Sequence, residues 1–177
     1  ITQVVTIHDM IPELFVDTYD LPHLKQIRDS KSLCLKTAHR IIAISEHTKK
    51  DLQNIYNIPS SKIDVIYHGV DYHLFSTPLA KTVTDQILTK YNLASPYFFY
   101  LGGRLHHKNF VRFLTAYAHS AASKDIKLAV AGEPWQENEL ELIRSLDIGH
   151  QLIWIPNLSE NELPTVYQNA KAFAFPS

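Results

Sequence analysis

The sequence predicts an α/β protein with two parallel, doubly wound sheets. Short apolar runs alternate along the chain with stretches in which apolar residues recur at the 3.6-residue period of a helix. This alternation stops after Asp71 and starts again at Pro96, which indicates two domains. Chains that alternate strands and helices in this way form parallel sheets with helices between the strands.

The first half carries three apolar runs that we expect to be strands. They are Ile1–Ile7, Arg40–Ile44 and Ile63–Tyr67. Met10–Glu13 is expected as a loop after the first strand. The face of the next helix is expected to comprise Leu24, Ile27, Cys34, Leu35 and Ala38, interrupted by Lys31. Ser45 is the predicted N-cap of a second helix, which ends before Pro59.

The second half repeats the pattern after an irregular stretch. A short helix is predicted through Ile87, Leu88 and Tyr91. The expected strands that follow are 97–101, 126–130, 152–155 and 172–175, with helices from about 108, through 140–146, and up to about 170. Ser159 and Glu162 have the spacing of a capping box for the last helix. We therefore expect domains at 1–75 and 96–177, joined by a link at 76–95.

Composition excludes several classes of protein. The 177 residues carry 17 basic and 18 acidic side chains, so no basic surface for nucleic acid is indicated. Hydrophobic residues make up 45% and charged residues 20%, the balance of a folded water-soluble chain. No apolar run approaches the length of a bilayer span. The single cysteine, Cys34, favours a reducing compartment, so a cytoplasmic location is expected.

The segment from Gly102 to Asn109 is the strongest candidate for a binding site. Two glycines, Gly102 and Gly103, follow an aromatic strand, and Arg104 and Lys108 precede a helix. Glycines let backbone approach a ligand closely, a helix start offers unpaired N–H groups, and two cations add charge. This arrangement favours a phosphate group. The alternative from local chemistry alone is a glycine turn with two solvated cations.

The motifs together resemble those of the group 1 glycosyltransferases. The segments that carry the resemblance are 41–48, 63–71, 102–109, 131–133 and 158–175, and they come in family order over nearly the whole chain. The resemblance implies the GT-B fold, with two Rossmann-like domains, and a retaining transfer of a hexose from a nucleoside diphosphate sugar to a hydroxyl of a glycan or glycolipid. Members are typically about twice as long, so it implies a fragment that is inactive alone.

The resemblance also assigns roles to particular residues. It implies that Arg104 and Lys108, with Gly102 and Gly103, hold the diphosphate of a GDP- or UDP-linked donor. Gly132 and Leu158 correspond to the vicinity of the base and sugar, and a glycine is common in the family where Pro156 stands. His8 corresponds to a family histidine near the transferred sugar, although a histidine that ends a strand can equally be a packing residue.

The resemblance bears on partners and cofactors as well. It implies no catalytic metal, and the ten histidines show no ligand spacing for one. The segments 8–12 (His-Asp-x-Ile-Pro) and 44–46 (Ile-Ser-Glu) are most similar to bacterial enzymes of surface-polysaccharide assembly, often mannosyltransferases, for which peripheral contact with the membrane is expected. Two other functions stay open: a GT-B sugar-nucleotide epimerase, and a non-catalytic protein that binds nucleotide sugars.

Smaller assignments rest on the residues themselves. Gly69 and Gly132 are expected to be required by the backbone where strands end. Trp135 and Trp154 suit either packing or stacking against a base or sugar, and packing is favoured. Asp9 is a lesser candidate for the work assigned to His8, and Glu13 is expected to be a solvated loop residue.

Overall fold

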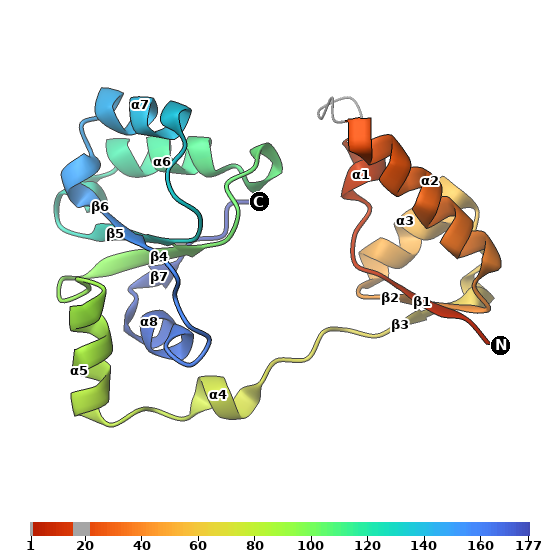
Figure 1. Ribbon diagram of the computed structural model, residues 1–177, viewed down its shortest axis with the longest axis horizontal. Coiled ribbons are helices and arrows are strands. Elements are labelled where there is room, and N and C mark those ends of the chain that lie inside the picture. Colours follow the sequence, from red (N-terminus) through yellow and green to blue (C-terminus); the bar gives the residue numbers. More distant parts are fainter. Residues whose placement is uncertain (1, 16–21) are drawn as a thin grey trace. The chain divides into compact units, whose positions relative to one another are not determined.

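The computed structural model describes residues 2–15 and 22–177. The chain forms two compact units, Ile1–Val70 and Asp71–Ser177, and each is described by itself. Both units contain parallel sheets with helices between the strands (Figure 1). The α/β class predicted from the sequence is therefore confirmed.

The first unit is built on a three-stranded parallel sheet in the order β1-β2-β3. Its elements are β1 (Val4–Ile7), α1 (Ile11–Leu14), α2 (Pro22–Thr37), β2 (Arg40–Ala43), α3 (Glu46–Tyr56), the 3-10 turn η1 (Ser60–Lys62) and β3 (Ile63–Val65). The strands are added in sequence order, so right-handed crossovers place α2 and α3 on the same face of the sheet. Figure 1 shows α1, α2 and α3 together on that face.

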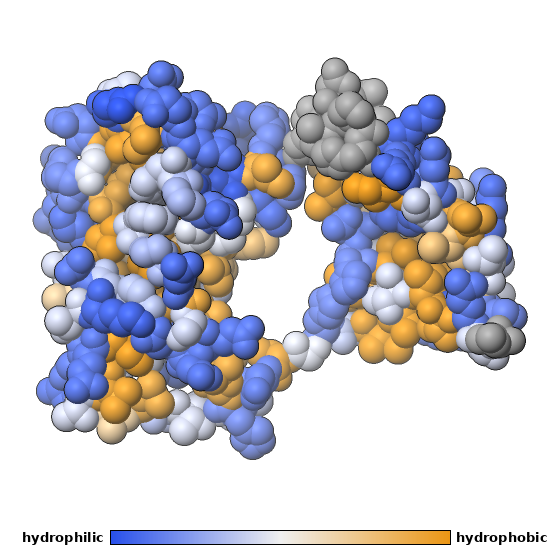
Figure 2. All heavy atoms as spheres, in the orientation of Figure 1, coloured by the Kyte–Doolittle hydropathy of each residue, from blue (hydrophilic) through white to orange (hydrophobic). Residues whose placement is uncertain are grey.

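The core of the first unit lies between this sheet and its helices. Alternate strand residues point into it, so that Ile7, Ile41 and Ile63 are buried against Leu35 and Leu52. Residues of the opposite register, such as Val4, remain exposed. Hydrophobic residues also reach the surface of each unit on the side shown in Figure 2.

Residues Met10–Glu13, predicted as a loop, fall mostly in the short helix α1, and Glu13 is not solvated. Its carboxylate accepts hydrogen bonds from Lys31 Nζ at 2.9 Å and from the Tyr56 hydroxyl at 2.8 Å. The side chain of Glu13 is only 2% exposed, and that of Lys31 is 14% exposed. The predicted face of α2 is confirmed at Leu35 and Ala38, which are buried, and wrong at Ile27 and Cys34, which are exposed. The side chain of Lys31 is mostly buried because it pairs with Glu13.

The second unit contains a four-stranded parallel sheet in the order β6-β5-β4-β7. Its elements are α4 (Tyr72–Ser76), α5 (Lys81–Lys90), β4 (Tyr97–Leu101), η2 (His106–Lys108), α6 (Phe110–His119), η3 (Ala121–Lys124), β5 (Lys127–Ala131), α7 (Glu137–Ser145), η4 (Gly149–Gln151), β6 (Leu152–Ile155), α8 (Leu163–Asn169) and β7 (Ala172–Phe173). Helices α6 and α7 cover one face, and α5 and α8 cover the other (Figure 1).

Each face of this sheet has its own core, because successive strand residues point to opposite sides. Tyr97 and Phe99 pack toward α5 and α8, in a cluster that includes Val166. Tyr100 packs toward α6 and α7, beside Phe110. Helices on both faces make this unit doubly wound, as the sequence predicted.

Helix α5 belongs to the second unit rather than to a free linker. Its Ile87 is buried in the same cluster as Tyr97, and the following Tyr91 is also buried there. The second half of the segment 76–95, expected to be an interdomain link, therefore contributes residues to the core of the second unit.

The expected capping box of the last helix is wrong. Helix α8 begins at Leu163, and the Ser159 hydroxyl donates to the Glu162 carboxylate at 2.8 Å instead of capping the helix. That carboxylate also accepts from Lys90 Nζ at 2.7 Å and from the Tyr91 hydroxyl at 2.7 Å. Glu162 thus connects α8 to the end of α5.

Candidate functional site

The order of strands in the second unit determines where a ligand fits. The chain runs outward from β4 to β5 and β6, and then returns to place β7 on the other side of β4. Helix α6, which follows β4, and helix α8, which precedes β7, cover opposite faces of the sheet, so a crevice is expected at the carboxyl ends of these two strands. A hollow of about 200 Å³ lies there, and its lining comprises Tyr100, Leu101, Gly102, Gly103, Lys108, Phe175, Pro176 and Ser177.

Two of the predicted glycines are required by the backbone in this region. Gly102 has φ of 125° and Gly132 has φ of 139°, values that residues with a side chain rarely adopt. A Cβ on Gly132 would also lie 3.3 Å from the Gly102 carbonyl oxygen. The ends of β4 and β5 therefore approach each other closely through these two glycines.

Gly103 and Gly69 differ from these two glycines. A Cβ on either would meet no atom within 4 Å, and neither has a positive φ. The expectation that the backbone requires glycine at position 69 is therefore not met. The carbonyl of Gly103 accepts a hydrogen bond from the Tyr100 hydroxyl at 2.8 Å. Burial raises the pKa of that hydroxyl, so it stays protonated and able to donate.

Lys108 reaches the crevice from a short turn. The sequence predicted a helix from about 108, but residues His106–Lys108 form a 3-10 turn and Asn109 adopts a left-handed conformation before α6 begins at Phe110. The Lys108 ammonium lies 5.3 Å from the centre of the Phe175 ring. Asn109 Nδ2 donates to the Pro176 carbonyl at 3.3 Å, which joins the start of α6 to the segment after β7.

Helix α6 presents its N-terminus beside this turn. Asn109 makes no side-chain cap, so the first N–H groups of the helix are not satisfied by a capping side chain. Lys108 and two glycines therefore line the crevice, and the start of α6 adjoins it through the hydrogen bond from Asn109 to Pro176. A cation beside glycines is an arrangement suited to a phosphate group.

Arg104, predicted to act beside Lys108, lies in different surroundings. Its Nε donates to Glu139 Oε1 at 2.6 Å, and its Nη2 donates to Glu139 Oε2 at 3.0 Å. The side chains of the pair are only 5% and 7% exposed. Arg104 is absent from the lining of the crevice that contains Lys108. The structure therefore does not bring the two predicted phosphate ligands into one hollow.

Glu139 is a residue that the sequence reasoning missed. It occupies the N3 position of α7, where its side chain and that of Gln136 form a capping box. The sequence signal was a glutamate three residues after a polar residue at the start of a helical pattern. Its pairing with Arg104, 35 positions away, depends on tertiary structure and cannot be predicted from neighbouring residues in the sequence.

Gly132 and Leu158, predicted to lie together, do share a hollow of about 350 Å³ with Trp154 and Pro156. Leu101 lines both this hollow and the crevice, so the two adjoin. Trp154 Nε1 donates to the Gly132 carbonyl at 3.0 Å, and the side chain is 39% exposed. Trp135 is a packing residue, since its ring lies 4.8 Å from the Arg104 guanidinium.

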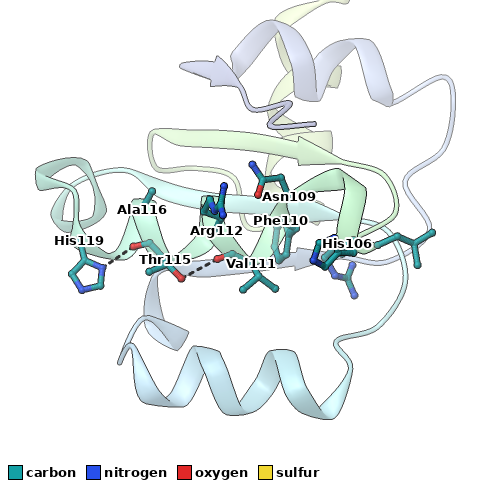
Figure 3. Close-up of a pocket in the computed structure, with 10 residues that line it drawn as sticks. His106, Asn109, Phe110, Val111, Arg112, Thr115, Ala116 and His119 are labelled. Atoms are coloured by element: carbon teal, nitrogen blue, oxygen red, sulfur yellow. Dashed lines mark hydrogen bonds between the residues drawn. The ribbon is translucent and has the colours of Figure 1, made fainter. Parts of the chain in front are cut away.

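A further hollow of about 690 Å³ runs along α6. Figure 3 shows its lining along this helix, from His106 to His119. The Thr115 hydroxyl donates to the Val111 carbonyl, and His119 Nδ1 lies 2.8 Å from the Thr115 carbonyl oxygen. These two polar groups are therefore occupied by the helix itself. Arg104 and Arg112 also line this hollow, so the predicted phosphate ligand Arg104 lies here and not in the crevice.

His8 lies at the carboxyl end of β1 in the first unit, as predicted. Its exposed ring stacks on that of His68, with centroids 5.4 Å apart and planes 20° from parallel. Asp9 Oδ1 accepts from the Ile11 N–H at 3.1 Å, so this carboxylate is occupied at the start of α1.

Residues 2–15 and 22–177 present neither a cluster of metal ligands nor a helix that could span a membrane. No group of three or more His, Cys, Asp or Glu side chains in this part of the chain is placed to hold a metal ion. Nor does any helix in it combine the length and apolar character needed to cross a bilayer.

Comparison with known proteins agrees with these features. The family model described as Glycosyltransferase Family 4 matches residues 1–74, and the model described as Glycosyl transferases group 1 matches residues 85–177. The O-antigen chain mannosyltransferase RfbU of Salmonella typhimurium is 23% identical over 177 residues, which are 99% of this chain and 45% of RfbU.

Solved structures share the fold over the same extent. WaaG, a glycosyltransferase involved in lipopolysaccharide biosynthesis, matches with a TM-score of 0.75 and 13% identity over 99% of this chain and 50% of WaaG. Anabaena Alr3699/HepE in complex with UDP and glucose matches with a TM-score of 0.74 and 16% identity over 98% of this chain and 46% of HepE. The chain spans about half the length of these relatives, its fold is of the GT-B type, and it belongs to the group 1 glycosyltransferases.

Proposed function

We propose that the intact protein is a retaining glycosyltransferase that moves a hexose from a nucleoside diphosphate sugar to a hydroxyl of a glycan or glycolipid. One observation carries this proposal. The crevice between β4 and β7 combines Lys108 with the glycines Gly102 and Gly103, at the place where doubly wound sheets bind their ligands. Membership of the group 1 glycosyltransferases supports the class of reaction.

The chemistry explains why a cation is needed there. When the bond between the sugar and the diphosphate breaks, negative charge grows on the departing diphosphate oxygen. Lys108 and the first N–H groups of α6 are fixed donors that stabilise this charge as it develops. Gly102 and Gly132 keep the adjoining backbone free of side chains, so phosphate oxygens can approach it.

We assign the base and sugar of the donor to the adjoining hollow. Gly132 and Leu158 line it, and Leu101 connects it to the crevice. The complexes of HepE with UDP and with UDP-glucose support a nucleoside diphosphate as the ligand. The similarity to RfbU supports mannose as the sugar, and hence GDP as an alternative carrier.

His8 is the residue we assign to the transferred sugar. A neutral imidazole at the exposed end of β1 can hydrogen-bond a sugar hydroxyl. A lipid-linked glycan as acceptor would bring the protein to the inner face of the membrane as a peripheral protein. Co-sedimentation with acidic phospholipid vesicles tests that part of the proposal.

We further propose that transfer requires no metal ion. Lys108, which lines the crevice, supplies positive charge of the kind that a divalent cation provides to diphosphates elsewhere. Turnover that persists in EDTA, with the donor in excess, is the expected result. Turnover abolished by EDTA and restored by a divalent cation would contradict it.

Calorimetric titration of the intact protein with UDP, GDP and ADP tests the donor site. We expect one nucleotide to bind and Lys108→Ala to weaken that binding. Incubation with the matching sugar nucleotides and a lipid-linked glycan then tests the reaction. An epimerised donor formed without acceptor would indicate an epimerase, and binding without any product would indicate a non-catalytic binding protein.

A further inference from the structure

The ion pair between Arg104 and Glu139 joins the loop after β4 to the first turn of α7. Both oxygens of the carboxylate are engaged, since Oε1 accepts from Nε and Oε2 accepts from Nη2. Glu139 is one of the few polar side chains buried in the described residues, with a relative exposure of 6%. A pair removed from water in this way is held in one geometry, because every alternative leaves a buried charge without its partner.

Other contacts fix the two partners further. Arg104 Nη2 also donates to the Pro134 carbonyl at 2.7 Å, and the guanidinium lies over the ring of Trp135. Glu139 Oε2 accepts from the Gln136 N–H at 2.8 Å, which ties the carboxylate to the start of α7. The arginine is therefore held by a carboxylate that is itself held by its own helix.

The Nη1 edge of the Arg104 guanidinium takes no part in the hydrogen bonds described above. The hydrogen bonds that Arg104 makes to described residues use Nε and Nη2. Nη1 lies 3.8 Å from the position that a Cβ on Gly132 would take, next to the Gly102 carbonyl. Gly132 lines the hollow assigned to the donor. The Nη1 edge thus lies beside the junction of Gly132, which lines that hollow, and Gly102, which lines the adjoining crevice.

We propose that Glu139 is a positioning residue, which holds Arg104 so that its Nη1 edge meets the diphosphate of the donor. This inference rests on the function proposed above. A free arginine side chain loses rotamer entropy when it is ordered. Glu139 imposes that order before the ligand arrives, so binding loses less entropy.

A double-mutant cycle on nucleotide affinity tests the inference in the intact protein. UDP and GDP are titrated into the wild type, Glu139→Gln, Arg104→Ala and the double variant. We expect Glu139→Gln to weaken binding about tenfold and Arg104→Ala to weaken it at least as much. In the Arg104→Ala background, Glu139→Gln should have no further effect, because it acts through Arg104.

Glu137→Gln is the matched control. Glu137 lies on the same helix and also pairs with an arginine, Arg144, at 2.9 Å, but both side chains are exposed. This variant should bind nucleotide as the wild type does. If Glu139→Gln does not fold, Glu139→Asp keeps the charge and draws the carboxylate back by one methylene group, and it should lose part of the affinity.

A second readout does not depend on nucleotide. Hydrogen exchange at Arg104 Nε, followed by NMR, should be slow in the wild type and markedly faster in Glu139→Gln. If the two substitutions weaken nucleotide binding additively, Glu139 is a merely structural residue and the inference is overturned. The inference is also overturned if Glu139→Gln changes neither the nucleotide affinity nor the exchange rate at Arg104 Nε. If the wild type binds no nucleotide, the proposed donor site itself fails, and the inference fails with it.

Discussion

The ammonium of Lys108 lies 5.3 Å from the centre of the Phe175 ring, and both residues line the crevice between β4 and β7. A cation over an aromatic face is attracted by the ring without being neutralised, unlike a cation that is paired with a carboxylate. Phe175 therefore keeps Lys108 at the crevice with its charge available to an anion. Arg104, by contrast, is a cation that is paired with a carboxylate, that of Glu139.

Replacing Lys108 with alanine should weaken the binding of nucleoside diphosphates by about 10- to 100-fold, because a hydrogen bond to a charged group contributes about 1.5–3 kcal/mol. Turnover should fall by about 10²–10³, since the same donor stabilises the departing diphosphate. Calorimetry and initial rates measure the two effects. Lys124→Ala is the control, because that exposed lysine precedes the amino end of β5, away from the crevice. Equal affinity in both variants would remove Lys108 from the site.

Replacing Gly132 with alanine should both destabilise the protein and impair nucleotide binding. A side chain at φ of 139° introduces strain of about 1–3 kcal/mol, and its Cβ would press on the Gly102 carbonyl at 3.3 Å. Thermal unfolding and titration with UDP and GDP measure the two effects. Gly149→Ala is the matched control, since its Cβ would meet Ile143 at an ordinary 3.6 Å and its φ is not positive. A Gly132→Ala protein as stable as the control would contradict this reasoning.

The sequence was sufficient for the strands and for the glycines that line the candidate site. Apolar runs such as Tyr97–Leu101 predicted strands because residues buried on both faces of a parallel sheet must all be apolar. Gly102 and Gly132 were predicted because a strand that ends in a close backbone approach requires glycine. Both features depend on residues that are neighbours in the chain, which is why the sequence displays them.

The sequence was insufficient where a charged residue is satisfied by a distant one. Glu13 was expected in solvent, but Lys31 and Tyr56 bury it. Arg104 was expected to face the ligand directly, but Glu139 takes one edge of it. Neither partner is identified by spacing or by periodicity, because only the fold brings the two groups together.

The N-cap at Ser45, which the sequence did predict, gives a test in the first unit. The Ser45 hydroxyl accepts from the Thr48 N–H at 3.1 Å. Ser45→Ala should lower the free energy of unfolding by about 1 kcal/mol, and Ser45→Asp should restore most of it, because aspartate is an equally good cap. Urea denaturation followed by circular dichroism measures both variants. Equal stability of all three proteins would show that the cap contributes nothing.

Glu162 should make the stability of the second unit depend on acidity. Hydrogen bonds from Lys90, Tyr91 and Ser159 hold the pKa of its carboxyl at about 2, below the ordinary value of 4.5. A carboxyl with a lowered pKa in the folded state stabilises the protein above pH 4.5, and the contribution is lost as the pH falls toward 2. Because Lys90 is 55% exposed and water screens the pair, we expect this contribution to be about 1 kcal/mol.

Chemical denaturation from pH 2 to pH 7 measures this contribution as a difference between the wild type and Glu162→Gln. The variant should be less stable by about 1 kcal/mol near neutral pH, and the difference should shrink steadily below pH 4.5 because the wild-type carboxyl becomes protonated. Glu160→Gln, at an exposed position two residues earlier, should differ little from the wild type throughout. If the difference in unfolding free energy between the two proteins stays constant across this pH range, Glu162 stabilises α5 against α8 through its shape and not through its charge.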